Sequence, residues 1–349
     1  MGANLSILKG EYLGDLLAQP QALDDTCSKL ELPKSLSTIS ARLQRGKYHR
    51  VVLTGMGSSF HALHPLNLEL IAQGHTAVMV ESSELIHYQT QLLDSRTLIV
   101  AVSQSGRSIE IVRLLKLNRR RATVIAVTNS ADSPLYRQSD AVLLTHAGPE
   151  FSVSCKTYVS TLVALKFLGD VLCDRNASRS HKVLKHAAPA IASYLADWRS
   201  HVELLVERLK GIRDLFLIGR GASLAAVGTG ALIIKESTHR HAEGMGVAAF
   251  RHGPFEMLGD EVFVLIFFGD RKTKKLNRGF KDDIREQGGQ AELVGDESSL
   301  PPFHLPNDVP GIMPVLEILP VQMMTLALAA LGGREPGRFE RTAKITVKE

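Results

Sequence analysis

The sequence has little cysteine, few aromatic side chains and no long apolar run. Its three cysteines, Cys27, Cys155 and Cys173, are too few and too widely spaced for the disulfide framework of a secreted domain. Aromatic residues make up 5% of 349 residues and do not interleave with the basic clusters, which argues against nucleic-acid binding despite a formal charge of +5. No run approaches the roughly 18 apolar residues of a membrane helix, and no secretion signal is apparent. We therefore expect a cytoplasmic protein that binds neither membranes nor nucleic acids.

What the sequence does contain is a globular composition, 44% hydrophobic and 22% charged, with room for two domains. Short apolar segments alternate with helical ones from Val51 onward. The predicted strands of this first half are Val51–Thr54, Thr76–Val80, Leu98–Val102, Val124–Val127 and Ala141–Leu144. Such alternation predicts an α/β fold with an open parallel sheet, whose ligands bind beyond the carboxyl ends of the strands.

The second half of the chain repeats the first. Val51 aligns with Leu215 and Leu98 with Val262, both at an offset of 164 residues, which indicates a duplicated domain. The predicted fold is two such domains, each an open parallel sheet flanked by helices. We expect an N-terminal helical lead-in over residues 1–47, the first domain over 48–175, connecting helices over 176–210, the second domain over 211–335, and a tail over 336–349 that closes the active site.

Small polar residues follow the strand Leu98–Val102. They are Ser103, Gln104, Ser105 and Ser108, and an amphipathic helical stretch begins after them. A helix start exposes unpaired backbone N–H groups and the positive end of the helix dipole, so uncharged hydrogen-bond donors there suit a phosphate. The alternative is an ordinary serine cap. The second copy has Phe267 to Asp270 at the corresponding place, and an aspartate competes with phosphate, so we expect one phosphate site in each chain.

A glycine turn follows the strand Val51–Thr54. It reads Gly55, Met56, Gly57, Ser58, Ser59 and lacks the third glycine of a dinucleotide-binding motif, because His61 and Ala62 stand there. We therefore predict no NAD site. The turn lies at the same predicted sheet edge as Ser103 to Ser105, where Ser59 can reach a sugar hydroxyl or a phosphate.

Several motifs in this order and spacing resemble the sugar isomerase (SIS) domain proteins. The similarity is to the tandem-domain type found in the isomerase portion of glucosamine-6-phosphate synthase, and it extends over residues 11 to 349. The motifs are T-G-M-G-S-S-F-H-A (54 to 62), S-Q-S-G-R-S (103 to 108), V-T-N-S-A-D-S-P-L (127 to 135), K-E-S-T-H-R-H-A-E (235 to 243), F-R-H-G-P (250 to 254) and T-A-K-I-T-V (342 to 347).

The resemblance implies a role for each matching residue. It makes Ser103, Gln104, Ser105 and Ser108 the phosphate loop, with Gly57, Ser58 and Ser59 beside it, and Val153 and Ala343 backbone contacts to the sugar. Glu236 then moves the proton between C1 and C2, His252 opens the sugar ring, and Lys344 acts near those carbons. Aldose–ketose chemistry needs such a base, acid and cation. The resemblance further implies a homodimer; in relatives this histidine reaches across to a second subunit, and His252 can act either in its own chain or in the neighbouring one. We expect no metal and no other cofactor.

The sequence departs from that family pattern in three places. No glutaminase domain is expected, since only ten residues precede Glu11 and Gly2 stands where its cysteine nucleophile would be. Thr229 and Ile233 replace a glutamate and a lysine, and the segment after Val153 is one residue short. These departures favour aldose–ketose isomerisation coupled to amine release from an amino-sugar 6-phosphate. A deglycase of 6-phosphorylated fructosamines, a plain isomerase and a non-catalytic sugar-phosphate sensor remain alternatives.

Each candidate catalytic residue also has a structural explanation. Glu236 can pair with Arg240 on a helix surface, His252 can cap a turn, and Lys344 can belong to a solvated tail. His239 and His241 point to different faces of a helix, so we do not expect a metal site there.

Overall fold

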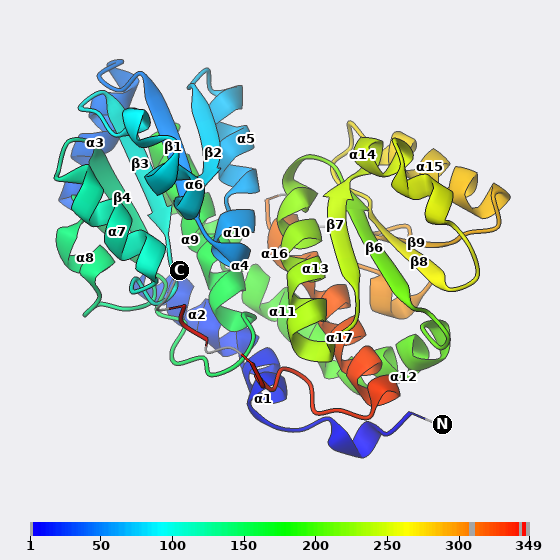
Figure 1. Ribbon diagram of the computed structural model, residues 1–349. Helices are drawn as coiled ribbons and strands as arrows, with labels where there is room; N and C mark the ends of the chain where they lie inside the picture. The colour runs from blue at the N-terminus through cyan, green and yellow to red at the C-terminus, as the bar shows by residue number, and fades with distance from the viewer. Residues whose placement is uncertain (1–2, 307–310, 342–343, 347–349) are drawn as a thin grey trace. The chain divides into compact units, whose positions relative to one another are not determined.

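The computed structural model describes residues 3–306, 311–341 and 344–346, and it divides into two units that each contain one parallel sheet (Figure 1). The first-sheet unit consists of residues 21–150, 156–185 and 341–349, and the second-sheet unit of residues 1–20, 151–155 and 186–340. Each unit therefore includes one end of the chain, and in both cases it is the end that lies farther along the sequence from the sheet of that unit. The N-terminal segment joins the second-sheet unit, and the C-terminal tail joins the first-sheet unit.

The first sheet has five parallel strands in the order β2-β1-β3-β4-β5. The strands are β1 (Arg50–Gly55), β2 (Ala77–Glu81), β3 (Thr97–Val102), β4 (Thr123–Thr128) and β5 (Ala141–Leu144). All six residues of β3 are buried, as expected for a central parallel strand covered by helices on both faces. The five strands predicted for this half are confirmed.

Helices cover both faces of the first sheet (Figure 1). One layer contains α3 (Lys34–Gln44), α5 (His64–Ala72) and α9 (Lys156–Leu172), and the other contains α6 (Ser82–His87), α7 (Ile109–Asn118) and α8 (Pro134–Gln138). The remaining helices are α2 (Gln19–Lys29), α4 (Gly57–His61) and α10 (Ala177–Leu184). Alternate strand residues such as Val52, Ile99 and Ala101 form a core with the α6–α8 layer.

The second sheet has four parallel strands in the order β7-β6-β8-β9. Its strands are β6 (Asp214–Gly219), β7 (Ala242–Gly246), β8 (Val262–Phe267) and β9 (Gln290–Val294). Its helices are α1 (Glu11–Leu17), α11 (Ala187–Ala196), α12 (Trp198–Arg208), α13 (Leu224–Thr238), α14 (Val247–Arg251), α15 (Lys274–Glu286), α16 (Met313–Leu316) and α17 (Ile318–Gly332). Arg50 pairs with Thr97 in the first sheet and Asp214 with Val262 in the second, so the offset is 164 at one strand and 165 at the other. The duplication is confirmed, with one extra residue before β8.

One helical stretch corrects an expectation about long apolar runs. Met313–Gly332 spans 20 residues and is, among the described residues, long and apolar enough to cross a membrane by length and composition alone. Of its most apolar window 89% is buried, and α17 packs against α12 and α13. Glu317 and Gln322 interrupt the apolar pattern in the sequence. Its burial inside the second-sheet unit is typical of a core helix.

Candidate active site

The predicted phosphate loop lies at the carboxyl end of β3, directly before α7. Ser103 Oγ accepts a hydrogen bond from the Gly106 backbone N–H at 3.1 Å, and Ser105 Oγ accepts one from Arg107 N–H at 3.2 Å. Because both hydroxyls accept from the backbone, their own protons remain available for a ligand. Ser108 precedes α7 without using its side chain as a cap. The loop therefore presents neutral donors at a helix start, where an anion is favoured.

The glycine turn lies beside that loop, as predicted from the order of the strands. β1 and β3 are neighbours, with Thr54 opposite Ala101. A Cβ added at Gly55 would lie 2.9 Å from the carbonyl oxygen of Val102, so the two strand ends approach closely. Ser58 and Ser59 occupy the first turn of α4 and are half-buried. The structure brings the turn and the phosphate loop to one edge of the first sheet.

The C-terminal tail returns to the start of α7. The Ile109 N–H donates to the Thr346 carbonyl at 3.2 Å, and Lys344 Nζ lies 2.8 Å from Glu150 Oε2. Lys344 is thus held in an ion pair rather than in a frayed solvated tail. Ala343, the predicted sugar contact next to it, lies outside the described residues.

Glu150, the partner of Lys344, is a residue that the sequence analysis missed. Its side chain is fully buried and also accepts hydrogen bonds from the Thr157 N–H at 3.0 Å and from Thr157 Oγ1 at 2.6 Å. A buried carboxylate needs such partners to offset its desolvation. Glu150 therefore connects the tail to the start of α9.

Lys344→Met is expected to lower the free energy of unfolding by about 1–3 kcal/mol, because it removes a cation from a buried carboxylate. Glu150→Gln combined with Lys344→Met should recover part of that loss, since the glutamine leaves no buried charge. Urea denaturation of both single variants and the double variant gives the coupling energy. Strictly additive effects would contradict the pairing.

In the second-sheet unit, Glu236 lies in the last turn of α13 and is half-buried. The helix ends at Thr238, because His239 adopts a left-handed conformation with φ of 54°. Arg240 therefore lies beyond the helix, and its guanidinium donates to the Ile212 carbonyl at 3.2 Å. The predicted alternative of a helical surface pair with Arg240 loses its geometric basis.

The face of α13 that leads to Glu236 carries no charge. Ile233 and Thr229, one and two turns before it, are both fully buried. Val153, another predicted sugar contact, is also buried and belongs to the same unit as Glu236.

His252 is exposed at the end of α14. The preceding residue anchors this turn, since the Arg251 guanidinium lies 4.5 Å from the centre of the Phe280 ring and forms an ion pair with Asp283. The contacts of Arg251 thus fix the backbone at His252, while the His252 imidazole faces solvent. Its predicted role stays a prediction.

Among the described residues no group of three His, Cys, Asp or Glu side chains is placed to hold a metal ion.

The second copy of the phosphate loop is occupied by the protein's own carboxylate. Asp270 Oδ1 accepts hydrogen bonds from Thr273 N–H at 3.1 Å and Thr273 Oγ1 at 3.2 Å, immediately before α15. This confirms the expectation that Asp270 takes the helix start in this copy. Ser223, the counterpart of Ser59, donates to the buried Glu317 at 2.6 Å.

Burial raises the pKa of Glu317 from an ordinary 4.5 to about 7, and the Ser223 hydrogen bond opposes part of this shift. The pKa of this carboxyl is higher in the folded state than in the unfolded state, so the folded state binds the proton more tightly. Its contribution to the free energy of unfolding is therefore fully present below pH 4.5 and is lost as the pH rises to about 7. The loss amounts to about 3 kcal/mol. Glu317→Gln should therefore flatten the decline of the unfolding free energy between pH 5 and 7, measured by urea denaturation. An unchanged slope would contradict it.

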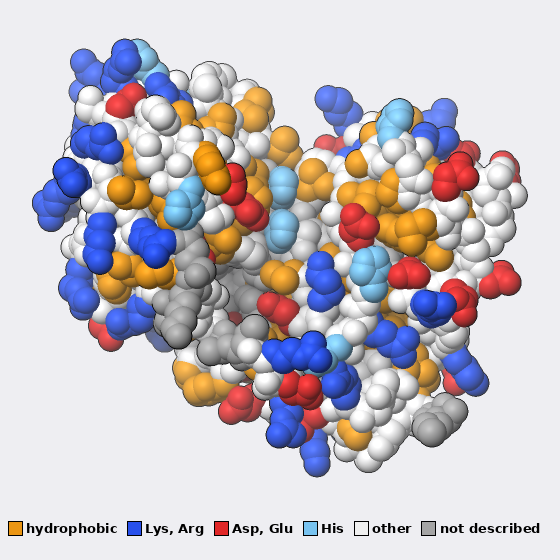
Figure 2. Space-filling model, in the orientation of Figure 1, with side chains coloured by type: hydrophobic (Ala, Val, Ile, Leu, Met, Phe, Trp, Pro, Cys, Tyr) orange, Lys and Arg blue, Asp and Glu red, His pale blue; other side chains and the backbone are white. Residues whose placement is uncertain are grey.

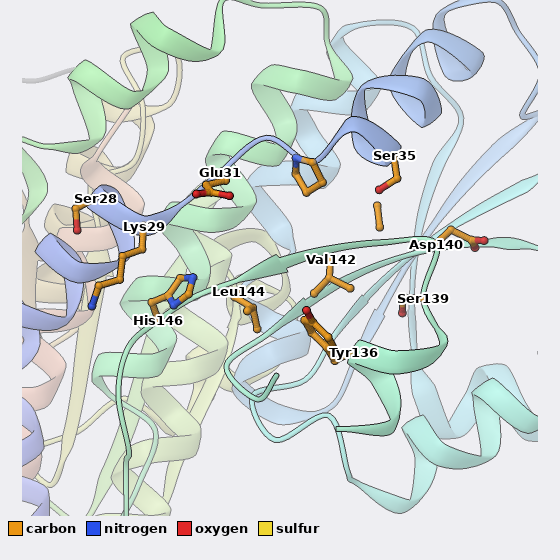
Figure 3. A pocket seen from close by; sticks show the side chains of 12 residues that line it. Ser28, Lys29, Glu31, Ser35, Tyr136, Ser139, Asp140, Val142, Leu144 and His146 are labelled. Carbon is orange, nitrogen blue, oxygen red and sulfur yellow. The ribbon is translucent and has the colours of Figure 1, made fainter. Parts of the chain in front are cut away.

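A separate hollow lies along the free edge of the first sheet (Figure 3). Its volume is about 730 Å³, and its walls come from β5, α8 and the connection between α2 and α3. Tyr136, Val142 and Leu144 line one side, and Lys29 and Glu31 the other (Figure 3). None of the predicted site residues lines it, so it takes no part in the proposed chemistry.

Basic side chains are dispersed over the face of the described residues seen in Figure 2, where acidic groups interrupt them. The cluster around Lys274 shows the pattern, since its amine lies 2.8 Å from Asp296 Oδ1 and 3.0 Å from Glu297 Oε1. Carboxylates of the same chain thus neutralise part of this basic cluster.

The two parallel sheets and the neutral donor loop after β3 define a duplicated α/β protein of the doubly wound class. Residues 46–169 match the SIS domain family, so this part of the chain is a SIS domain. Similar proteins include a glutamine–fructose-6-phosphate aminotransferase of Pyrococcus horikoshii, 30% identical over 98% of this chain and 59% of its own length. The chain thus spans less than two thirds of that relative.

Solved structures with the same fold include two with low sequence identity. The C-terminal domain of the glucosamine-fructose-6-phosphate aminotransferase from Francisella tularensis has a TM-score of 0.83 at 19% identity, covering 95% of this chain and 98% of that one. Glucosamine-6-phosphate deaminase from Thermotoga maritima has a TM-score of 0.77 at 17% identity, covering 97% and 100%. At these identities the likeness establishes the fold alone.

Proposed function

We propose that this protein is a phosphosugar enzyme that couples aldose–ketose isomerisation to amine release from an amino-sugar 6-phosphate. The observation that carries the proposal is the docking of the tail that bears Lys344 on the start of α7, where the neutral loop of Ser103 and Ser105 presents hydrogen-bond donors. A dianionic phosphate suits the loop, and a lysine suits a developing negative charge at the reacting carbons.

In the proposed mechanism the open-chain sugar binds through its phosphate to Ser103, Gln104, Ser105 and Ser108, with Ser59 beside them. His252 assists ring opening by moving a proton between the ring oxygen and the anomeric hydroxyl. Glu236 removes the proton from one of the carbons C1 and C2 and returns it to the other, and Lys344 stabilises the intermediate oxyanion or forms an imine. Hydrolysis of the resulting imine or carbinolamine releases the amine. The reaction requires no metal and no redox cofactor.

One further observation supports amine chemistry over a copy of the synthase reaction. Thr229 and Ile233 leave α13 without the ionised pair of the synthase-type domain. We also propose the remaining features expected from the sequence: a cytoplasmic homodimer, and domain boundaries at 48–175 and 211–335.

The purified protein should release ammonia from glucosamine 6-phosphate and form fructose 6-phosphate, each followed by a coupled assay. Amine release from 6-phosphorylated fructosamines instead would assign the deglycase reaction. Tight binding of these ligands without turnover would indicate a sensor and contradict the proposal.

A further inference from the structure

Tyr12 is a buried phenol that lies outside the predicted site residues. It belongs to α1 and is 1% exposed, and its Oη lies 3.0 Å from Thr325 Oγ1 on α17. The Thr325 hydroxyl itself donates to the Gln322 carbonyl at 2.6 Å. Because a threonine hydroxyl has a single proton, Tyr12 is the donor to Thr325. The phenol oxygen is then left as an acceptor.

A buried polar seam fixes the junction of α1 and α2 against α17 next to this phenol. Gln19 and Gln322 exchange two amide hydrogen bonds of 2.9 and 3.0 Å, and both side chains are fully buried. Gln19 also donates to the Leu16 carbonyl at 3.0 Å. Buried amides are costly when unpaired, so this reciprocal pairing holds the helix in one register. Tyr12 is therefore held in one place.

Tyr12 is coupled to the end of α13 that carries Glu236. A Cβ added at Gly337 would lie 2.7 Å from Tyr12 Cβ, so the ring packs directly on the Gly337 backbone. The Gly337 N–H donates to the carbonyl of Ser237, the residue after Glu236, at 3.3 Å. Ser152 Oγ donates to the Gly337 carbonyl at 2.5 Å. This contact chain links α1 to the helix turn of the proposed base.

The pKa of Tyr12 also responds to Glu236 and Ser237. Burial raises the pKa of Tyr12 far above its ordinary value, and the charges of Cys155 and, to a smaller extent, Glu236 raise it further, while the Thr325 and Ser237 hydroxyls lower it. The phenol therefore stays neutral at any working pH. The titratable groups that act on Tyr12 are thus Cys155 and Glu236.

We propose that Tyr12 is a positioning residue for Glu236, which it holds through Gly337 and Ser237 at the end of α13. The inference rests on the proposed function, in which Glu236 is the base. A phenol whose proton is committed to Thr325 has none to donate to the carboxylate. Its hydrogen bond to Thr325 fixes the ring that packs on Gly337, so losing the hydroxyl should loosen the end of α13 and change the surroundings of Glu236.

Tyr12→Phe is expected to lower kcat about 5–10-fold, to change KM less than about twofold, and to shift the acidic limb of the kcat profile by about 0.5–1 pH unit. Tyr194→Phe is the matched control. Tyr194 is a buried phenol of the same unit, its Oη donates to the Pro302 carbonyl at 2.7 Å, and burial is the one cause that raises its pKa. This control should lose similar stability and keep the wild-type pH profile.

Equal pH profiles for wild type and Tyr12→Phe would overturn the proposal, as would the same shift in Tyr194→Phe. If wild type turns over none of the substrates named above, the proposed function fails separately. The infrared band of the Glu236 carboxyl, obtained as wild type minus Glu236→Gln and titrated with pH, then decides the inference. A shift of that titration caused by Tyr12→Phe supports it, and no shift overturns it.

Discussion

Glu236→Gln is expected to reduce kcat about 10³-fold while leaving the affinity for a sugar 6-phosphate within about threefold of wild type. General base catalysis contributes roughly 10²–10⁴-fold, and glutamine keeps the size of the side chain but cannot accept the carbon-bound proton. The half-buried position of Glu236 at the end of α13 is suited to this role, since partial removal from water strengthens a carboxylate as a base. Steady-state assays of ammonia release give kcat, and calorimetric titration gives the affinity.

The control for that variant is Glu243→Gln. Glu243 lies on β7 of the same unit and is exposed, so the same chemical change there should leave both quantities unaltered. A Glu236→Gln protein with wild-type turnover would remove Glu236 from the mechanism. A protein that lost affinity and turnover together would indicate a structural role.

Gly106→Ala should weaken binding of glucosamine 6-phosphate at least about tenfold. Gly106 has φ of 60° in the middle of the phosphate loop, and an added Cβ would lie 2.3 Å from Ser133 Oγ and 2.7 Å from its Cβ. Both the left-handed backbone and the contact with Ser133 oppose a side chain, so the loop must move. The serine hydroxyls and backbone amides that would hold the phosphate move with it.

Gly74→Ala separates the clash from the backbone strain. Gly74 also has a positive φ, 89°, in the first-sheet unit, but an added Cβ would meet nothing within 4 Å. Both variants should lose about 1–2 kcal/mol of unfolding free energy through strain, whereas only Gly106→Ala should lose phosphate affinity. Calorimetric titration with glucosamine 6-phosphate, and with unphosphorylated glucosamine for comparison, measures the difference. Equal affinities in the two variants would contradict the phosphate role of the loop.

Local patterns in the sequence were sufficient to predict the sheets. The apolar run Leu98–Val102 followed by Ser103 to Ser105 specifies a buried strand and a polar helix start without any knowledge of distant residues. The offset of 164 likewise follows from comparing two short stretches. Asp270 was predicted to displace an anion because its chemistry conflicts with one at a helix start, whatever its surroundings.

The residues that the sequence analysis missed act through partners far away in the chain. Glu150 is a single acidic residue in a loop, and its ion-pair partner Lys344 lies 194 positions later. Tyr12 and Thr325 are separated by 313 positions. The local spacing of apolar and polar residues cannot predict such pairs, because they form only when segments far apart in the sequence pack together. Glu317 is similar, since its raised pKa follows from burial of a single carboxyl within a stretch that is otherwise apolar.

The way the two units share the chain ends has a consequence for synthesis on the ribosome. The segment 1–20 emerges early, yet the rest of its unit is finished only near residue 340. At roughly 5–20 residues per second, the nascent α1 waits on the order of 15–65 s for α17, with the apolar side of Leu16 and Tyr12 uncovered. The apolar side of this helix thus stays without its partner until the second half is made, and slow translation of that half prolongs the exposure.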